Sequence, residues 1–257
     1  MDLGLTGKVA LITGGSEGIG RAAAEVLAEE GAHVVIIARR ADVLEKAAAG
    51  IRAKGGSVLT IAADVTDPQA VENFVAQAVA HFGRLDIIVN NAGTSSAGPF
   101  EKATDEIWQQ DINLKLFAAI RVSRAAIPHL RKQGGGRIIN ITTVSGKQPA
   151  AKSVPTSVTR AAGIALTKAL SKELAVDNIL VNTVCVGIFK SGQQERAASR
   201  QNLVLEPHYE DIGSKVPLGR IGEAREAANV IAFLASEAAS YVTGASVNVD
   251  GGTSGVV

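Results

Sequence analysis

A glycine-rich turn near the start of the chain constrains its fold more than any other feature. The segment TGGSEGIG begins at Thr13, directly after a short apolar run, and leads into a helical pattern. In that setting Gly14 allows a tight turn, Gly18 lets the backbone approach a pyrophosphate, and Gly20 lets the helix pack closely on the strand. Free N–H groups at the start of the helix would bind the phosphates. The sequence therefore predicts a dinucleotide site, with contacts at Gly14, Ser16, Glu17, Gly18, Ile19 and Gly20.

Short apolar runs and amphipathic helical patterns alternate along the whole chain. The expected strands are Lys8–Thr13, His33–Ala38, Val58–Ala62, Leu85–Asn90, Arg137–Thr142, Leu180–Cys185 and Ser246–Val249. After the glycine turn, the expected helices cover residues 42–54, 67–82, 104–131, 155–176 and 223–235. This alternation predicts an α/β fold, a Rossmann-type doubly wound parallel sheet of about seven strands with helices on both faces.

The segment from about Gly187 to Lys215 departs from this pattern. It is polar, has weak periodicity, and is longer than an ordinary connection between elements. Long connections of this kind are often lids or binding loops, so we expect a substrate lid over residues 187–215. No linker, repeat or shift in composition divides the chain, and residues 1–257 are expected to form one domain.

Composition excludes several classes of function. The formal net charge is +1 and the basic residues form no run, which argues against a nucleic-acid partner. With Cys185 as its single cysteine, the chain has no internal disulfide, and its histidines lack metal-ligand spacing, so no metal site is predicted. No apolar run reaches the roughly 18–20 residues that span a bilayer. We therefore expect a cytoplasmic protein that binds no membrane and acts on a small molecule.

The glycine spacing, Gly-x-x-x-Gly-x-Gly, resembles that of the short-chain dehydrogenase/reductase family. Further segments are similar to that family along essentially the whole chain, including NNAG at Asn90 to Gly93, GRIINI from Gly136, and YVTGASVNVDGG from Tyr241. The resemblance implies further coenzyme contacts at Asp64, Val65, Asn90, Ala92 and Gly93. It also implies a homo-oligomer, a tetramer or a dimer, built through the two long helices and the C-terminal segment.

The residues after the second strand bear on which dinucleotide is bound. An acid at that point would bind the ribose 2′-hydroxyl of NAD, but Ala38 is followed by Arg39 and Arg40. Arg39 can pair with the 2′-phosphate of NADP in a forked geometry; the alternative is a solvated charge at the start of a helix. Glu17 argues the other way, because NADP-binding members often carry a basic residue there. We predict NADP, with NAD as the alternative.

The family's active site is usually built from Asn, Ser, Tyr and Lys, and this chain departs from it. By resemblance, Asn113 falls at the position of the Asn and Thr143 at that of the Ser, with Thr142 and Ser145 as near alternatives. Thr156 falls at the position of the Tyr and Arg160 at that of the Lys, four residues apart on one helix face.

These two replacements change the chemistry that the site can perform. An aliphatic hydroxyl such as that of Thr156 is a far weaker acid than a phenol. Arg160 keeps its charge, so it can hold the coenzyme ribose but relays protons poorly. Beyond the sixth strand, the family's usual Pro-Gly is Val186-Gly187 in this chain. The resemblance implies that backbone at Gly187 and Phe189 meets the nicotinamide.

Three functions remain in competition. The first is an NADP-dependent oxidoreductase that acts on a carbonyl or an alcohol, with its proton coming from water, Thr156 or Tyr209. Lys147 and Lys152 are further proton donors to consider, although each is more simply explained as a solvated loop charge. The second is a catalytically silent dinucleotide-binding protein, a sensor or scaffold subunit. The third is a lyase or isomerase that uses Arg160 and the threonine hydroxyls.

Overall fold

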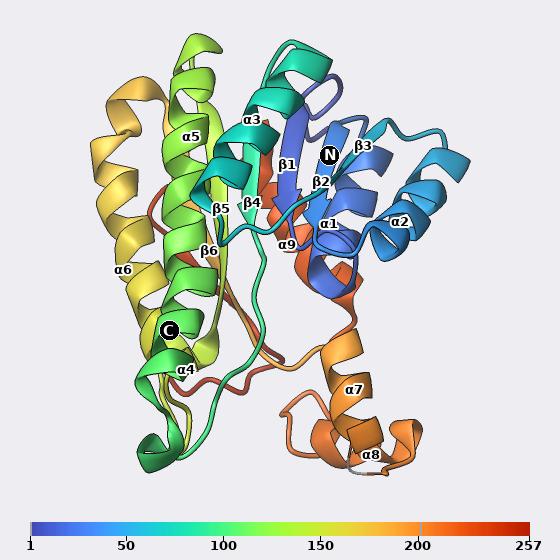
Figure 1. The fold of residues 1–257 in the computed structure, drawn as a ribbon, viewed down its shortest axis with the longest axis vertical. Helices are drawn as coiled ribbons and strands as arrows, with labels where there is room; N and C mark the ends of the chain where they lie inside the picture. The colour runs from blue at the N-terminus through green and yellow to red at the C-terminus, as the bar shows by residue number, and fades with distance from the viewer. Residues whose placement is uncertain (1, 201) are drawn as a thin grey trace.

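The computed structural model describes residues 2–200 and 202–257. Its centre is a seven-stranded sheet in the order β3-β2-β1-β4-β5-β6-β7, in which every neighbouring pair is parallel (Figure 1). The strands are β1 Val9–Thr13, β2 His33–Ala38, β3 Val58–Ala62, β4 Ile87–Asn90, β5 Gly136–Thr143, β6 Ile179–Val186 and β7 Ser246–Val249. The prediction of a doubly wound parallel sheet is confirmed. Buried β-branched runs separated by helices leave few other arrangements of the chain.

The strand order reverses between β1 and β4. From β1 the chain runs outward to β2 and β3 and then returns to β4 on the other side of β1. At such a switch point the connections leave in opposite directions, which opens a crevice beyond the carboxyl ends of the strands. The turn that begins at Thr13 and the NNAG segment that begins at Asn90 both lie at this point. The topology therefore places the predicted binding segments side by side.

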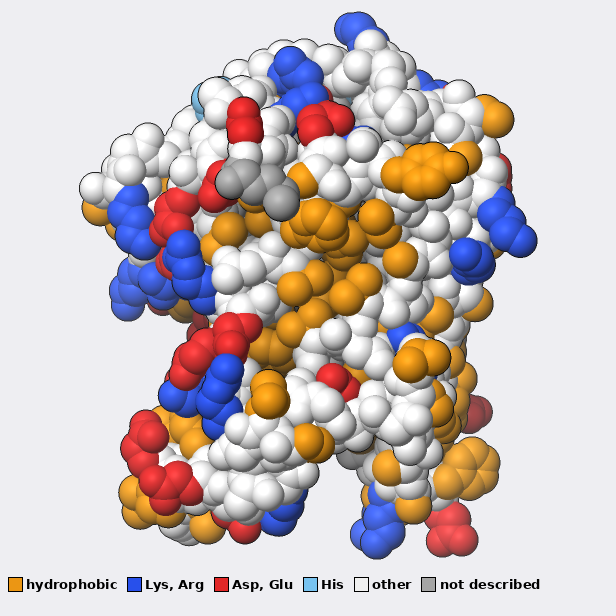
Figure 2. Space-filling view, turned by 180° about the vertical axis from the view of Figure 1, so that it is seen from behind, with side chains coloured by type: hydrophobic (Ala, Val, Ile, Leu, Met, Phe, Trp, Pro, Cys, Tyr) orange, Lys and Arg blue, Asp and Glu red, His pale blue; other side chains and the backbone are white. Residues whose placement is uncertain are grey.

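The segment 187–215 contains two helices where only a polar stretch of weak periodicity was expected. These are α7 Gly192–Arg200 and α8 Leu205–Gly213, which project beyond the carboxyl edge of the sheet (Figure 1). Seen from behind, they form a lobe that stands off the body of the molecule beside a hollow (Figure 2). The residues of α7 are mostly Gln, Glu, Arg and Ala, which favour helix without leaving an apolar stripe. The spacing of apolar residues therefore gave no helical signal over α7.

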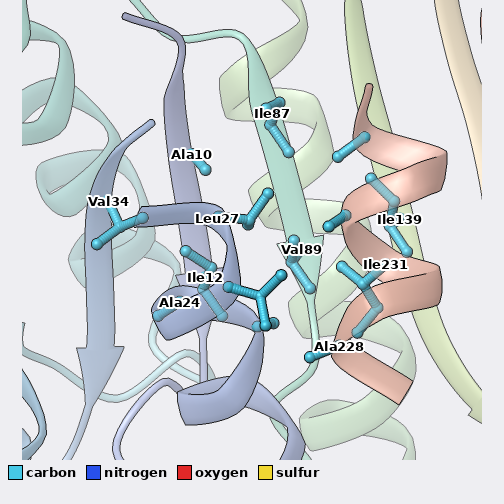
Figure 3. Close-up of a cluster of buried hydrophobic side chains, with 14 of the residues drawn as sticks. Ala10, Ile12, Ala24, Leu27, Val34, Ile87, Val89, Ile139, Ala228 and Ile231 are labelled. Atoms are coloured by element: carbon cyan, nitrogen blue, oxygen red, sulfur yellow. The ribbon is translucent and has the colours of Figure 1, made fainter. Parts of the chain in front are cut away.

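Helices cover both faces of the sheet. One face carries α1 Gly18–Glu29, α2 Ala41–Ala53 and α9 Ala224–Ala235, and the other carries α3 Pro68–Phe82, α5 Ala118–Lys132 and α6 Thr156–Glu173. Leu27 of α1 and Ile231 of α9 pack against Val89 in the middle of the sheet (Figure 3). These aliphatic layers are buried, so the strands that carry the site are held rigidly.

The long helix expected over residues 104–131 is interrupted. The structure has α4 Asp105–Ile112, a π-helical turn at Asn113–Phe117, and then α5. A π turn adds residues to the helical repeat without changing the apolar character of the sequence, so periodicity alone could not detect it. Such turns are frequent at functional sites, and this one lies next to α6. In the described part of the chain, no helix combines the length and apolarity needed to cross a membrane.

Candidate coenzyme and active site

The glycine turn is held in place by a neighbouring asparagine. Gly14 and Gly18 adopt φ values of +67° and +55°, a region that side chains rarely enter. Asn91 Nδ2 donates hydrogen bonds to the carbonyl oxygens of Thr13 and Gly14, at 2.9 and 3.2 Å. The backbone N–H of Ala92 donates to Thr13 Oγ1 at 3.1 Å. The turn after β1 and the segment after β4 are therefore one rigid unit across the switch point.

The start of α1 is open to a ligand. Glu17 is its N-cap residue, yet its side chain caps no backbone N–H, and the first turn holds no acid. A Cβ atom on Gly18 would meet only the Ser191 side chain, at 3.8 Å. Ser16 is nearly buried and Ile19 packs on the core. The free N–H groups and the positive end of the helix dipole fit a pyrophosphate at this turn.

The charge of Glu17, which argued against NADP, is paired within the protein. Its carboxylate lies 2.7 Å from Arg40 Nη2 and 3.4 Å from Arg196 Nη1 on α7. Arg39, at the end of β2, is exposed and forms no ion pair within residues 2–200 and 202–257. A 2′-phosphate at this edge would therefore meet a free arginine and a carboxylate whose charge is already balanced.

Two further sets of predicted coenzyme contacts lie at the ends of β3 and β4. Asp64 and Val65 follow β3; Asp64 Oδ1 accepts hydrogen bonds from the N–H and hydroxyl of Thr66, at 2.9 and 2.8 Å, and Val65 is buried. The Asn90 side chain points into the sheet interior, where Nδ2 donates to Asn140 Oδ1 at 2.9 Å. Its amide therefore stabilises β4 against β5.

Arg160 of α6 reaches the end of the NNAG segment. Its Nη1 donates to the carbonyl oxygen of Ile141 at 2.9 Å, and a Cβ atom on Gly93 would lie 2.6 Å from Nη2. A side chain at position 93 would therefore displace the guanidinium from this place. Arg160 Nε is buried and has no hydrogen-bond partner among the described residues. An orphaned donor of this kind is rare in a folded protein and fits a site that is completed by a ligand.

Thr156 is part of a buried polar cluster that the sequence did not predict. Thr156 Oγ1 accepts hydrogen bonds from Lys115 Nζ at 2.8 Å and from the N–H of Ser96 at 2.9 Å. Lys115 also forms an ion pair with Asp111, whose other carboxylate oxygen accepts from Thr159 Oγ1 at 2.6 Å. Lys115 lies in the π-helical turn, 41 residues from Thr156, so its role could be found only from the fold.

The pKa of Lys115 reflects this environment. The Lys115 and Asp111 side chains are 1% and 0% exposed. Burial and the nearby charge of Arg160 lower the pKa of Lys115, the hydrogen bond and charge of Asp111 raise it, and the net result is a pKa of about 8. Burial also lowers the pKa of Arg160. Two cations thus share one carboxylate, and Lys115 is the one poised to release a proton near neutral pH.

Several predicted site residues lie apart from this cluster. Asn113 Oδ1 accepts from Arg121 Nη1 at 2.7 Å, so its side-chain oxygen is directed to α5. Thr143 Oγ1 lies 2.6 Å from Ser145 Oγ, so two of the hydroxyls considered for the serine position are bonded to each other. Phe189 is buried against Gly222, and the Gly187 N–H donates to Val249 at 2.9 Å.

The substitute proton donors are placed differently from Thr156. Tyr209 is buried in the α7–α8 lobe, its hydroxyl has no partner in the described structure, and burial raises its pKa. A raised pKa makes the phenol a weaker acid. Lys147 Nζ donates to the Ser246 carbonyl at 2.7 Å and to Asn248 Oδ1 at 2.6 Å, which ties it to β7. Cys185 is a buried core thiol beside Thr142.

Known proteins resemble this chain along its whole length. The family model described as enoyl-(acyl carrier protein) reductase matches residues 14–254. The 3-oxoacyl-[acyl-carrier-protein] reductase FabG of Thermotoga maritima is 36% identical over 251 residues, which cover 96% of this chain and 98% of that protein. Human dehydrogenase/reductase SDR family member 4 is 34% identical over 250 residues, covering 97% of this chain and 88% of that protein.

Solved structures give the same result. L-sorbose reductase from Gluconobacter frateurii, complexed with NADPH and L-sorbose, superposes with a TM-score of 0.95 at 37% identity, and the match covers 100% of each chain. These similarities agree with the sheet order, the glycine turn and the NNAG segment at the switch point. The chain therefore belongs to the short-chain dehydrogenase/reductase family.

Proposed function

We propose that this protein is an NADP(H)-dependent oxidoreductase that interconverts a carbonyl compound and an alcohol. The observation that carries the proposal is the meeting of the open start of α1, Arg160 and Thr156 around the ends of β1 and β4. The family relatives named above are reductases, and one binds NADPH and a ketose. A bound nicotinamide supplies or accepts the hydride, while the protein orients the substrate and handles the proton.

In this proposal the site is an altered form of the family's active site. Thr156 and Arg160 stand where other members carry Tyr and Lys. Arg160 holds the coenzyme ribose through its guanidinium, whose Nε has no partner among the described residues, and Thr143 polarises the carbonyl. The segment 187–215 is the lid of a single domain. Gln193 Nε2 of α7 donates to the Gly93 carbonyl at 3.1 Å, and Arg196 pairs with Glu17, so α7 bridges the two walls of the coenzyme crevice.

We further propose that the protein is cytoplasmic and assembles as a dimer or a tetramer. A cytoplasmic dimer or tetramer would bury α5 and α6, which lie next to each other on one outer face (Figure 1). Two large apolar side chains near this face, Phe117 and Val158, are 42% and 49% exposed, which suits a subunit contact.

The direct test is turnover. NADPH binding is measured first by coenzyme fluorescence, and NADPH absorbance is then followed with a panel of ketoses, 3-oxoacyl thioesters and simple ketones. We expect binding and turnover with at least one class. Binding without turnover on the panel would favour the silent dinucleotide-binding protein instead. That alternative gains further weight if activity appears only when Thr156→Tyr and Arg160→Lys are combined.

Arg39 tests the choice of coenzyme. Hydrogen bonds to a charged group contribute about 1.5–3 kcal/mol, so Arg39→Ala is expected to weaken NADPH binding by about tenfold or more. NADH has no 2′-phosphate, and its affinity should not change. Arg52→Ala, an exposed arginine farther along on α2, serves as the control for charge. Tighter binding of NADH than NADPH by the wild type, or an equal loss for both coenzymes, contradicts the assignment.

A further inference from the structure

Lys115 is a buried lysine that the proposed function does not yet use. Lysine is almost never fully buried unless it is paired, because desolvating the ammonium is costly. Here the pairing is with Asp111 on the preceding helical turn, but Lys115 Nζ also donates to Thr156 Oγ1. The π-helical turn brings this lysine against α6. The ammonium is therefore directed at the hydroxyl that stands in the proposed active site.

The hydrogen bonds around Thr156 leave its own proton free for a substrate. A hydroxyl has two acceptor lone pairs and one donor proton. Both lone pairs are used, one by Lys115 Nζ at 2.8 Å and the other by the Ser96 N–H at 2.9 Å. Neither partner can accept the hydroxyl proton, since each is itself donating. Within the described structure no other group accepts it. The hydroxyl proton of Thr156 is therefore available to a ligand.

We propose that Lys115 supplies, through the Thr156 hydroxyl, the proton that a carbonyl substrate takes up on reduction. This inference rests on the proposed function. Thr156 would be the catalytic residue that touches the substrate oxygen, and Lys115 a positioning residue that acts through it. A threonine alone is too weak an acid for the task. A cation hydrogen-bonded to its oxygen both stabilises the developing negative charge and replaces the lost proton.

The proton transfers balance within this chain. As the carbonyl carbon gains a hydride, the C=O π pair becomes a lone pair on the substrate oxygen. That oxygen takes the proton of Thr156 Oγ1, and the O–H electron pair remains on Oγ1. Oγ1 then takes a proton from Lys115 Nζ, which becomes a neutral amine beside the Asp111 carboxylate. After the product leaves, the amine regains its proton from water through the same hydroxyl. Oxidation of an alcohol runs the sequence in reverse.

The charges that face Lys115 set its pH dependence. Asp111 of α4 favours the ammonium, whereas Arg160 of α6 and burial disfavour it. With the pKa of Lys115 at about 8, reduction requires the form that exists below this pH. We expect kcat/KM for reduction to be level below pH 8 and to fall above it, by about tenfold per pH unit.

Three substitutions test the relay. Lys115→Arg keeps a positive charge that is not released, and Lys115→Met removes the charge. Each is expected to lower kcat/KM on the order of 100-fold and to abolish the fall above pH 8, while NADPH still binds. If Lys115→Met fails to fold because Asp111 is left unpaired, the double variant Lys115→Met with Asp111→Asn removes both charges. Lys46→Met, an exposed lysine on α2, is the matched control and should behave as the wild type.

A spectroscopic measurement needs no substrate. The ¹³Cε resonance of Lys115, identified by its loss in Lys115→Arg, is expected to titrate near pH 8 in the coenzyme-free protein. A midpoint near the ordinary lysine value overturns the relay. So does an active wild type whose Lys115→Met variant keeps its rate and pH profile, which leaves the proposed function intact. Failure of the wild type to turn over any carbonyl overturns the proposed function, and the relay with it.

Discussion

Replacing Gly20 by alanine is expected to destroy the coenzyme site and to destabilise the protein. A Cβ atom at this position would lie 2.3 Å from Asn91 Nδ2 and 2.4 Å from the Gly14 carbonyl oxygen. Both atoms belong to the hydrogen bonds that hold the turn, so neither can move without opening it. Overpacking of this kind costs about 1–3 kcal/mol. Because the same turn presents the start of α1, we also expect NADPH binding to weaken by at least about tenfold.

Gly50 provides the matched control. It lies inside α2, and its Cβ would meet only the end of the Arg21 side chain, at 3.7 Å. Gly50→Ala is therefore expected to raise the free energy of unfolding by about 0.5–1 kcal/mol and to leave NADPH binding unchanged. Urea unfolding and coenzyme fluorescence measure both variants. A Gly20→Ala protein that binds NADPH normally would show that the turn is not the coenzyme site.

Local sequence signals predicted the sheet and the glycine turn after β1 because their causes are local. A buried parallel strand needs a short β-branched run, and a turn at positive φ needs glycine, so both leave a mark on neighbouring residues. Helix α7 left none, since its polar helix formers carry no apolar stripe. Helix α8 has apolar residues at helical spacing, Leu205, Tyr209 and Ile212, but it is only about two turns long and contains Pro207, so its signal is weak. In the sequence Asn91 is only one position of the NNAG segment, and its hydrogen bonds across the switch point depend on the fold.

The polar cluster around Thr156 lay beyond sequence reasoning for a different reason. Lys115 occupies a stretch that looks like uninterrupted helix, and only the π turn and the packing on α6 bring it to Thr156. Lys147 and Lys152 are the lysines that stand near Thr156 in the sequence. Lys147 is instead bound to β7. Chemistry at this site depends on contacts between residues far apart in the chain, which no short motif records.

Asp111→Ala is expected to have the largest effect on stability of any single change in this cluster. It leaves the buried ammonium of Lys115 without a counter-charge and the Thr159 hydroxyl without its carboxylate partner. Removing one member of a buried ion pair costs about 3–5 kcal/mol. Adding Lys115→Met removes the uncompensated charge, so the double variant should recover much of the lost unfolding free energy. Urea unfolding of the wild type, both single variants and the double variant gives the coupling energy between them.

An ion pair of the same spacing lies at the surface. It serves as the control that distinguishes the effect of burial on stability from the effect of pairing alone. Asp211 and Lys215 of the α8 region are also four residues apart, but their side chains are 66% and 70% exposed. Asp211→Ala should cause no measurable loss of unfolding free energy, because solvent screens the pair and rehydrates the lysine.

Losing Asp111 also removes the group that holds a proton on Lys115, so the pKa of Lys115 must fall further. The fall in kcat/KM should then begin at lower pH than in the wild type. If Asp111→Ala is as stable as Asp211→Ala, Lys115 is already neutral in the folded wild type. In that case the pH at which kcat/KM begins to fall would be the same in Asp111→Ala and in the wild type.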